Sequence, residues 1–145
     1  TDSWPSFKKN HSDQFEARLS QVKILKSKSV LLNDMEGWSL PIIVSHGEGR
    51  ACFKNEDEIN KLFDSEKICM TFVDSSGYQT EQYPLNPNKS PSGITGITND
   101  NGNITIMMPH PERVFRSHQF SWKPLSWGEY SPWMQIFINA KNFVS

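Results

Sequence analysis

The alternation of apolar and polar positions divides the chain into short runs that are typical of β-strands. Such runs lie at residues 15–25, 40–45, 50–53 and 68–74. Two more, residues 94–98 and 103–108, are joined by Asn99-Asp100-Asn101-Gly102, a polar tetrapeptide typical of a tight connection. The pattern therefore predicts a sheet of short strands that includes one β-hairpin.

Helical spacing of apolar residues occurs in two places. Asn55 is a good N-cap with Glu58 three residues later, and the stripe that follows predicts a helix: Ile59, Leu62 and Phe63. Ser131 and Pro132 are typical of a helix start, and the apolar positions after them predict the C-terminal helix: Trp133, Ile136, Phe137, Ala140, Phe143 and Val144. We expect the aromatic residues of this region to anchor that helix to the core: Trp122, Trp127, Trp133 and Phe137. Residues 29–35 predict one short helical turn, and residues 84–93 a long loop.

Composition places the chain among ordinary globular domains. It has 145 residues, of which 36% are hydrophobic and 21% charged, so one domain, or part of one, is expected. A formal net charge of -1 without a basic block gives little support to nucleic-acid or membrane-surface binding. Two cysteines, Cys52 and Cys69, do not make a secreted disulfide framework, so a cytoplasmic location is favoured. No apolar run approaches the roughly 20 residues of a membrane span.

The candidate chemistry lies directly after the hairpin, in Pro109-His110-Pro111-Glu112. Proline restricts its own backbone and that of the residue before it, which predicts an extended segment. Side chains alternate in an extended chain, so His110 and Glu112 should leave the backbone on the same side. A carboxylate that orients an imidazole is the arrangement that activates a serine or cysteine nucleophile. The segment lacks such a nucleophile.

Two other interpretations of the chemical residues stay open. His46-x-Glu48 repeats the spacing of His110-x-Glu112, so a metal site is chemically possible, although sequence spacing gives it little support. His46 is equally compatible with a structural role in the Gly47 to Gly49 turn. Both cysteines lie in apolar β-type runs, where cysteine behaves as a small buried hydrophobe.

Several motifs together resemble one family, the C-terminal glutamine amidotransferase domain of the large, single-chain phosphoribosylformylglycinamidine synthase of purine biosynthesis. The resemblance covers residues 4 to about 143 and depends on these motifs: Trp4-Pro5-x-Phe7, Asn10-x-Ser12-x-Gln14-Phe15-Glu16-Ala17-Arg18, Leu40-Pro41-Ile42, Ser45-His46-Gly47-Glu48-Gly49-Arg50, Gly93-Ile94-Thr95, residues 107–116, and Trp127-Gly128-Glu129-x-Ser131-Pro132-Trp133-Met134. It implies an α/β, flavodoxin-like class I amidotransferase fold, with residues 1–145 as the later part of one domain.

The resemblance also implies a Cys-His-Glu triad that hydrolyses glutamine and supplies ammonia for the ATP-dependent conversion of formylglycinamide ribonucleotide to formylglycinamidine ribonucleotide. His110 matches the base and Glu112 the carboxylate that orients it, whereas the family's Gly-x-Cys-x-Gly elbow would precede Thr1. Asn10, Ser12 and Phe15 match a segment that contributes to the glutamine pocket, and His46 is expected in a supporting role.

The partners implied are glutamine and the rest of the synthase polypeptide. No metal or cofactor is expected in this segment, since ATP and magnesium belong to other domains of the synthase. The isolated 145-residue chain should be inactive without its nucleophile. Two alternatives remain: a free-standing, non-catalytic amidotransferase-like module that binds glutamine or a synthase partner, and a metal-dependent hydrolase that uses His46 and His110.

Overall fold

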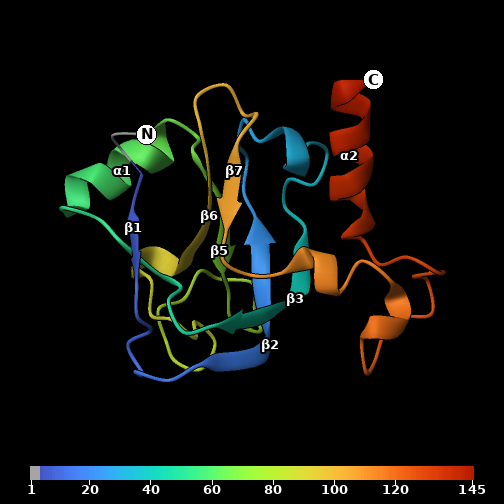
Figure 1. Cartoon of the computed structure of the whole chain (residues 1–145), viewed down its shortest axis with the longest axis horizontal. Helices are drawn as coiled ribbons and strands as arrows, with labels where there is room; N and C mark the ends of the chain where they lie inside the picture. Colours follow the sequence, from blue (N-terminus) through green and yellow to red (C-terminus); the bar gives the residue numbers. More distant parts are fainter. Residues whose placement is uncertain (1–3) are drawn as a thin grey trace.

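A five-stranded antiparallel sheet is the centre of the fold. The computed structural model describes residues 4–145, and the strand order in this sheet is β3-β2-β5-β6-β7. The strands are β2 (Glu16–Ile24), β3 (Ser39–His46), β5 (Ile68–Phe72), β6 (Ile94–Thr98) and β7 (Thr105–Met107). Two further strands, β1 (Ser6–Lys8) and β4 (Arg50–Cys52), form a separate antiparallel pair. Figure 1 shows α1 (Glu56–Asp64) and α2 (Met134–Val144) on opposite sides of the five-stranded sheet.

The strand predictions are confirmed: five of the six predicted runs contain strands of this sheet, and residues 50–53 contain β4 of the separate pair. β2 pairs with β3 along eight positions, from Glu16 opposite His46 to Lys23 opposite Ser39. β6 and β7 pair as the predicted hairpin. In β2 the side chains of Val22 and Ile24 are fully buried, whereas Leu19 on the other face is 55% exposed. The alternation seen in the sequence therefore separates a core face from an outer face.

The helix predicted after Asn55 is also confirmed, and its cap has the expected geometry. The Asn55 side-chain oxygen accepts a hydrogen bond from the backbone N–H of Glu58 at 2.9 Å. The Glu58 carboxylate accepts from the backbone N–H of Lys54 at 2.8 Å. Three acidic residues in the first turn, Glu56, Asp57 and Glu58, face the positive end of the helix dipole.

Replacing Asn55 by alanine should lower the free energy of unfolding by about 1 kcal/mol, because the N–H of Glu58 loses its acceptor. Asn60→Ala is the matched control, since Asn60 is an exposed residue inside the same helix and alanine is the better helix former. Urea unfolding of both variants measures the difference. Equal stability of the two variants would show that the cap contributes nothing.

The C-terminal helix begins at Met134, two residues later than Pro132, and it is attached to the sheet by Trp133. The Trp133 indole is fully buried and its Nε1 donates to the carbonyl of Pro41 at 2.7 Å. Ser131 donates its hydroxyl to the carbonyl of Val114 and accepts from the N–H of Trp133 at 3.2 Å. Trp133 is therefore the anchor of α2.

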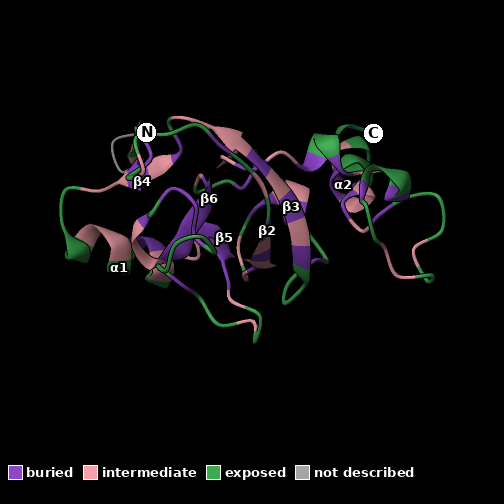
Figure 2. Ribbon diagram, turned by 90° about the horizontal axis from the view of Figure 1, so that it is seen from below, coloured by how far each residue is buried: buried purple, intermediate pink, exposed green. Residues whose placement is uncertain are grey.

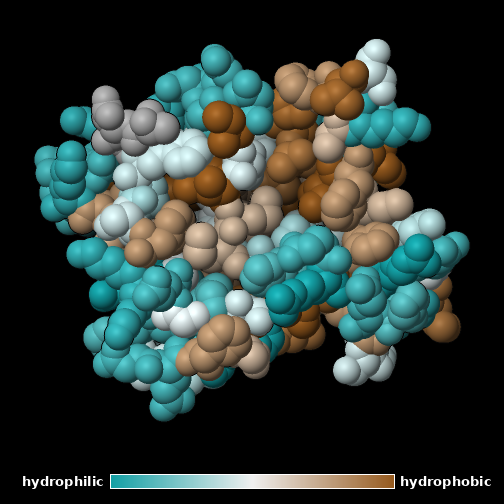
Figure 3. All heavy atoms as spheres, in the orientation of Figure 1, coloured by the Kyte–Doolittle hydropathy of each residue, from teal (hydrophilic) through white to brown (hydrophobic). Residues whose placement is uncertain are grey.

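The other predicted aromatic anchors differ in burial. Trp127 is partly buried and packs against the core beside Phe120. Phe137 is 41% exposed, but its ring packs edge-on against Phe115. Trp122 is 79% exposed, so the prediction that it anchors the helix is wrong, because it lies in a surface loop beyond the reach of the core. Figure 2 shows α2 exposed along one side, and Figure 3 shows apolar side chains over the same helix.

The parallel, flavodoxin-like part of the predicted fold is not found in residues 4–145. Every strand pair in this part of the chain is antiparallel. Short connections such as the one between β6 and β7 can join only antiparallel neighbours, whereas parallel strands need long crossovers. The described residues therefore form a mixed α/β domain with an antiparallel sheet. The short turn predicted at residues 29–35 is present as a 3₁₀ turn, Val30–Leu32.

Candidate functional site

The His110 and Glu112 side chains form a hydrogen-bonded pair. The distance from His110 Nδ1 to Glu112 Oε1 is 2.7 Å, and the two side chains are 30% and 55% exposed. The prediction that the two residues lie on the same side is confirmed, but its reason is wrong. Pro111–Arg113 is a 3₁₀ turn, not an extended segment, and this turn brings Glu112 back toward the imidazole. Proline favours such turns as much as it favours extended chain, since its φ suits both.

Two strands fix the backbone around this pair. The N–H of Met108 donates to the carbonyl of Thr95 in β6 at 3.2 Å, and the N–H of His110 donates to the carbonyl of Ile43 in β3 at 2.8 Å. The segment therefore runs from the end of β7 to the outer edge of β3. With Nδ1 bound to the Glu112 carboxylate, the lone pair at Nε2 is available to take a proton from another group. This is the geometry of an oriented general base.

His46 lies at the end of β3, on the strand that also binds the His110 backbone. Both of its ring nitrogens are buried, and neither has a hydrogen-bond partner among residues 4–145. Burial is the main cause that lowers the pKa of His46. The nearby His110 lowers this pKa further, whereas the negative charge of Glu16 acts to raise it. His46 is therefore a neutral imidazole at pH 7. A side chain at position 49 would overlap the His46 ring, so the ring lies directly on Gly49.

Asn10 holds the turn that follows His46. This residue is 1% exposed, and its side-chain amide donates to the carbonyls of His46 at 2.7 Å and Gln14 at 2.9 Å. Its side-chain oxygen accepts from the N–H of Gly49 at 3.2 Å, and its backbone N–H donates to the carbonyl of Gly47 at 2.8 Å. The amide of Asn10 is thus fully engaged by its own chain.

Ser12 and Phe15 lie on the same loop but have different surroundings. The Ser12 hydroxyl donates to the Glu16 carboxylate at 2.7 Å. Phe15 is 65% exposed, and its ring lies over Gly47. The four residues expected in the glutamine pocket, Asn10, Ser12, Phe15 and His46, therefore surround one turn, and among them Phe15 presents the largest exposed surface.

Sequence reasoning missed a second set of residues that supports this turn from the long loop. Asn88 is fully buried and its side-chain amide donates to the carbonyl of Gly49 at 2.7 Å. The oxygen of the same side chain accepts from Ser90 Oγ at 2.8 Å, and Ser90 in turn accepts from the N–H of Ala51 at 2.9 Å. The clustered Asn, Pro and Ser residues of this loop predicted only turns.

A buried ion pair was also missed. Glu16 is 2% exposed, forms an ion pair with Arg18, and lies opposite His46 in the β2–β3 register. The Arg18 guanidinium donates to the Tyr83 hydroxyl at 2.9 Å and lies 5.0 Å from the centre of the Tyr83 ring. The buried Glu16 carboxylate has an ion-pair partner in Arg18 and a hydrogen-bond donor in Ser12, so it is compatible with a structural role next to the turn that follows His46.

Neither cysteine forms a hydrogen bond with His110 within residues 4–145. Cys69 is fully buried in β5, and burial raises the pKa of its thiol to about 12, so the thiolate is not available at neutral pH. Cys52 is half-buried in β4. The prediction that Cys69 is a small buried hydrophobe is confirmed.

Two further classes of site were searched in the described part of the chain. Residues 4–145 contain no group of three or more His, Cys, Asp or Glu side chains placed to hold a metal ion. His46, Glu48, His110 and Glu112 therefore do not form the metal site that their spacing allowed. Among the helices of the same residues, none has the length and apolar character needed to cross a membrane.

Comparison with known proteins identifies the family. Residues 1–144 match the model of the CobB/CobQ-like glutamine amidotransferase domain. The chain belongs to this family. The fold of a chain in the PurLQS structure from Thermotoga maritima is similar, with a TM-score of 0.68 and 20% sequence identity. The alignment covers 97% of the present chain and 53% of the other, so this amidotransferase chain spans about half the length of that relative.

Proposed function

We propose that this chain is the base-bearing part of a glutaminase site, with His110 as the general base and Glu112 as the carboxylate that orients it. The observation that carries the proposal is the 2.7 Å hydrogen bond from His110 Nδ1 to Glu112 Oε1 in a glutamine amidotransferase domain. His110 Nε2 accepts the proton of a cysteine thiol and later returns a proton to the leaving ammonia. Glu112 stabilises the imidazolium that forms between these two steps.

The nucleophile comes from outside residues 4–145. Cys69 remains a buried thiol with its pKa raised to about 12, and Cys52 belongs to the β1–β4 pair. A class I amidotransferase places its cysteine at a sharp Gly-x-Cys-x-Gly turn, and neither Cys52 nor Cys69 lies in such a motif. The 145-residue chain alone is accordingly expected to release no ammonia from glutamine.

The residues around the Gly47 turn shape the glutamine pocket. Phe15 offers an exposed aromatic surface beside the turn and is the contact most accessible to substrate. Asn10 and Ser12 act through the backbone and through Glu16, because their polar groups are already hydrogen-bonded to the chain. His46 supports the pocket as a neutral ring packed on Gly49.

The reaction that consumes the ammonia follows from the sequence resemblance to phosphoribosylformylglycinamidine synthase. In this proposal glutamine is hydrolysed here, and ammonia passes to a synthase site in the same polypeptide that uses ATP and magnesium to make formylglycinamidine ribonucleotide in the cytoplasm. The proposal assigns the carbon–nitrogen ligase activity, and the ATP and magnesium sites, to that larger protein. The alternative is a non-catalytic module that binds glutamine or a synthase partner without hydrolysing it.

Glu112→Gln tests the proposal in the native polypeptide that carries this chain. The variant keeps the size of the side chain but removes its negative charge, so kcat for ammonia release from glutamine should fall by roughly 10² to 10⁴-fold while KM changes little. Glu129→Gln is the control, because Glu129 is an exposed carboxylate paired with Arg116 outside the site. A wild-type polypeptide that binds glutamine but releases no ammonia would favour the non-catalytic module.

A further inference from the structure

The connection between β6 and β7 contains asparagine side chains with different degrees of freedom. Asn99 accepts from the N–H of Ile104 at 3.1 Å, and its amide donates to the side-chain oxygen of Asn103 at 2.7 Å. Asn101 is exposed, and its side-chain amide forms no hydrogen bond within residues 4–145. The connection precedes β7, whereas His110 follows the other end of this strand (Figure 1). Asn101 is therefore free to rotate at the end of the hairpin away from the candidate site.

The residue after Asn101 is Gly102, and this pair is the only Asn-Gly dipeptide of the chain. The side-chain carbonyl carbon of an asparagine can react with the backbone nitrogen of the next residue, because the product is a five-membered imide ring. A glycine in the second position leaves this nitrogen least hindered, since it has no Cβ. The dipeptide thus carries both reacting groups.

The fold restrains the second of these groups. The N–H of Gly102 donates to the carbonyl of Asn99 at 3.1 Å, and the carbonyl of Gly102 accepts from the N–H of Val30 at 2.8 Å. A Cβ at position 102 would overlap the carbonyl of Lys28, so the Gly102 backbone packs directly on that residue. The nitrogen must leave its acceptor before it can lose its proton and attack. Ring closure therefore requires the loop to open locally.

We propose that Asn101 is a site of spontaneous deamidation, and that local opening of the β6–β7 connection sets the rate. The nitrogen of Gly102 attacks Cγ of Asn101 and gives its proton to solvent. The carbon–nitrogen bond of the side-chain amide breaks, and ammonia leaves with a proton taken from water. Water then opens the imide ring at either carbonyl, which leaves aspartate or isoaspartate at position 101.

The two products have different effects on the hairpin. Aspartate keeps the length of the main chain and adds a negative charge beside Asp100, which forms an ion pair with Lys67 at 2.9 Å. Isoaspartate lengthens the main chain by a methylene group, and Gly102 cannot then keep its contacts with both Lys28 and Val30. The isoaspartate form is therefore the less stable of the two.

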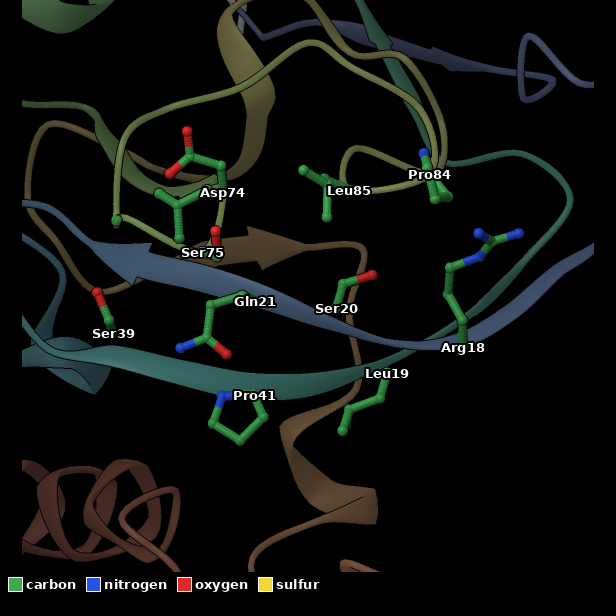
Figure 4. Close-up of a pocket in the computed structure, with 12 residues that line it drawn as sticks. Arg18, Leu19, Ser20, Gln21, Ser39, Pro41, Asp74, Ser75, Pro84 and Leu85 are labelled. Atoms are coloured by element: carbon green, nitrogen blue, oxygen red, sulfur yellow. The ribbon is translucent and has the colours of Figure 1, made fainter.

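The turn after β5 has the contrasting arrangement, in which the side chain is held. Asp74 and Ser75 belong to the wall of a groove of about 660 Å³ along β2 (Figure 4). One carboxylate oxygen of Asp74 accepts from the N–H of Ser76 at 2.9 Å and from the N–H of Tyr78 at 3.0 Å. A side chain held in this way does not reach the nitrogen of Ser75. Asp74 should therefore form no isoaspartate through the same ring, and it serves as an internal control.

Incubation of the native polypeptide at mildly alkaline pH, followed by peptide mapping with mass spectrometry, tests this proposal. Deamidation should occur at Asn101 before Asn99 or Asn103, and position 74 should contain no isoaspartate. A synthetic peptide of residues 97–105 gives the rate without the fold, and it should react roughly tenfold faster or more, because no contact has to open. Equal rates in peptide and polypeptide, or no product at Asn101, would each overturn the proposal.

Val30→Pro tests the role of loop opening. Position 30 begins the 3₁₀ turn, where the backbone of proline fits, and the substitution removes the N–H that binds the carbonyl of Gly102. The rate at Asn101 should rise roughly fivefold or more, the factor expected for the loss of one hydrogen bond. Val30→Ala keeps the N–H and should leave the rate unchanged. Equal rates in the two variants would contradict opening as the rate-setting step, and the peptide comparison remains decisive if Val30→Pro does not fold.

Discussion

Replacing His110 by alanine should abolish glutamine hydrolysis by the native polypeptide that carries this chain. The fall in kcat is expected to be roughly 10⁴-fold or more, since loss of the base in a nucleophile–base–carboxylate unit removes nearly all the rate contributed by the unit. His110 is 30% exposed and its side chain binds only Glu112 among residues 4–145, so its removal leaves the fold intact. KM for glutamine should change little, because the base is not required for binding.

Ammonia release from glutamine measures the effect, and product formation from added ammonium salt provides an internal reference. In the His110→Ala variant the glutamine-dependent reaction should be lost while the ammonia-dependent reaction continues, because the two reactions use different sites. His118→Ala is the matched control, as His118 is an exposed histidine of the 3₁₀ turn Ser117–Gln119. A kcat within tenfold of the wild type would exclude His110 as the base.

The parts of the fold predicted from sequence are those specified by local signals. Asn55 caps α1 because the cap involves residues only three positions apart, and the β6–β7 hairpin follows from its polar tetrapeptide. The order of strands is not local. β5 lies between β2 and β6 in the sheet, and nothing in the periodicity of β5 states which strands it will join.

The candidate site has the same division between local and distant interactions. His110 and Glu112 were found because their interaction spans two residues, although the turn between them was taken for extended chain. Asn88 was missed because its partner, the carbonyl of Gly49, is 39 positions away. The ion pair of Glu16 with Arg18 was missed likewise, because Arg18 is held by a hydrogen bond to Tyr83, 65 positions away.

The largest loss of stability is expected from Gly102→Ala. Gly102 has a φ of +72°, a backbone conformation that costs an alanine roughly 1–2 kcal/mol. An added Cβ would also overlap the carbonyl oxygen of Lys28, and this oxygen belongs to backbone that cannot rotate away. The carbonyl of Gly102 accepts from the N–H of Val30 at 2.8 Å, so relief of the overlap would break the contact between the hairpin loop and the 3₁₀ turn.

Gly37→Ala separates the two contributions. Gly37 has a comparable φ of +81°, but a Cβ at this position meets no atom within 4 Å. Gly37→Ala should therefore lower the free energy of unfolding by about 1 kcal/mol, the conformational cost alone. Gly102→Ala should lower it by about 3 kcal/mol or more, since the overlap with Lys28 adds to the same cost. Urea unfolding of the two variants measures the difference, and equal losses would mean that the loop moves away from Lys28 without penalty.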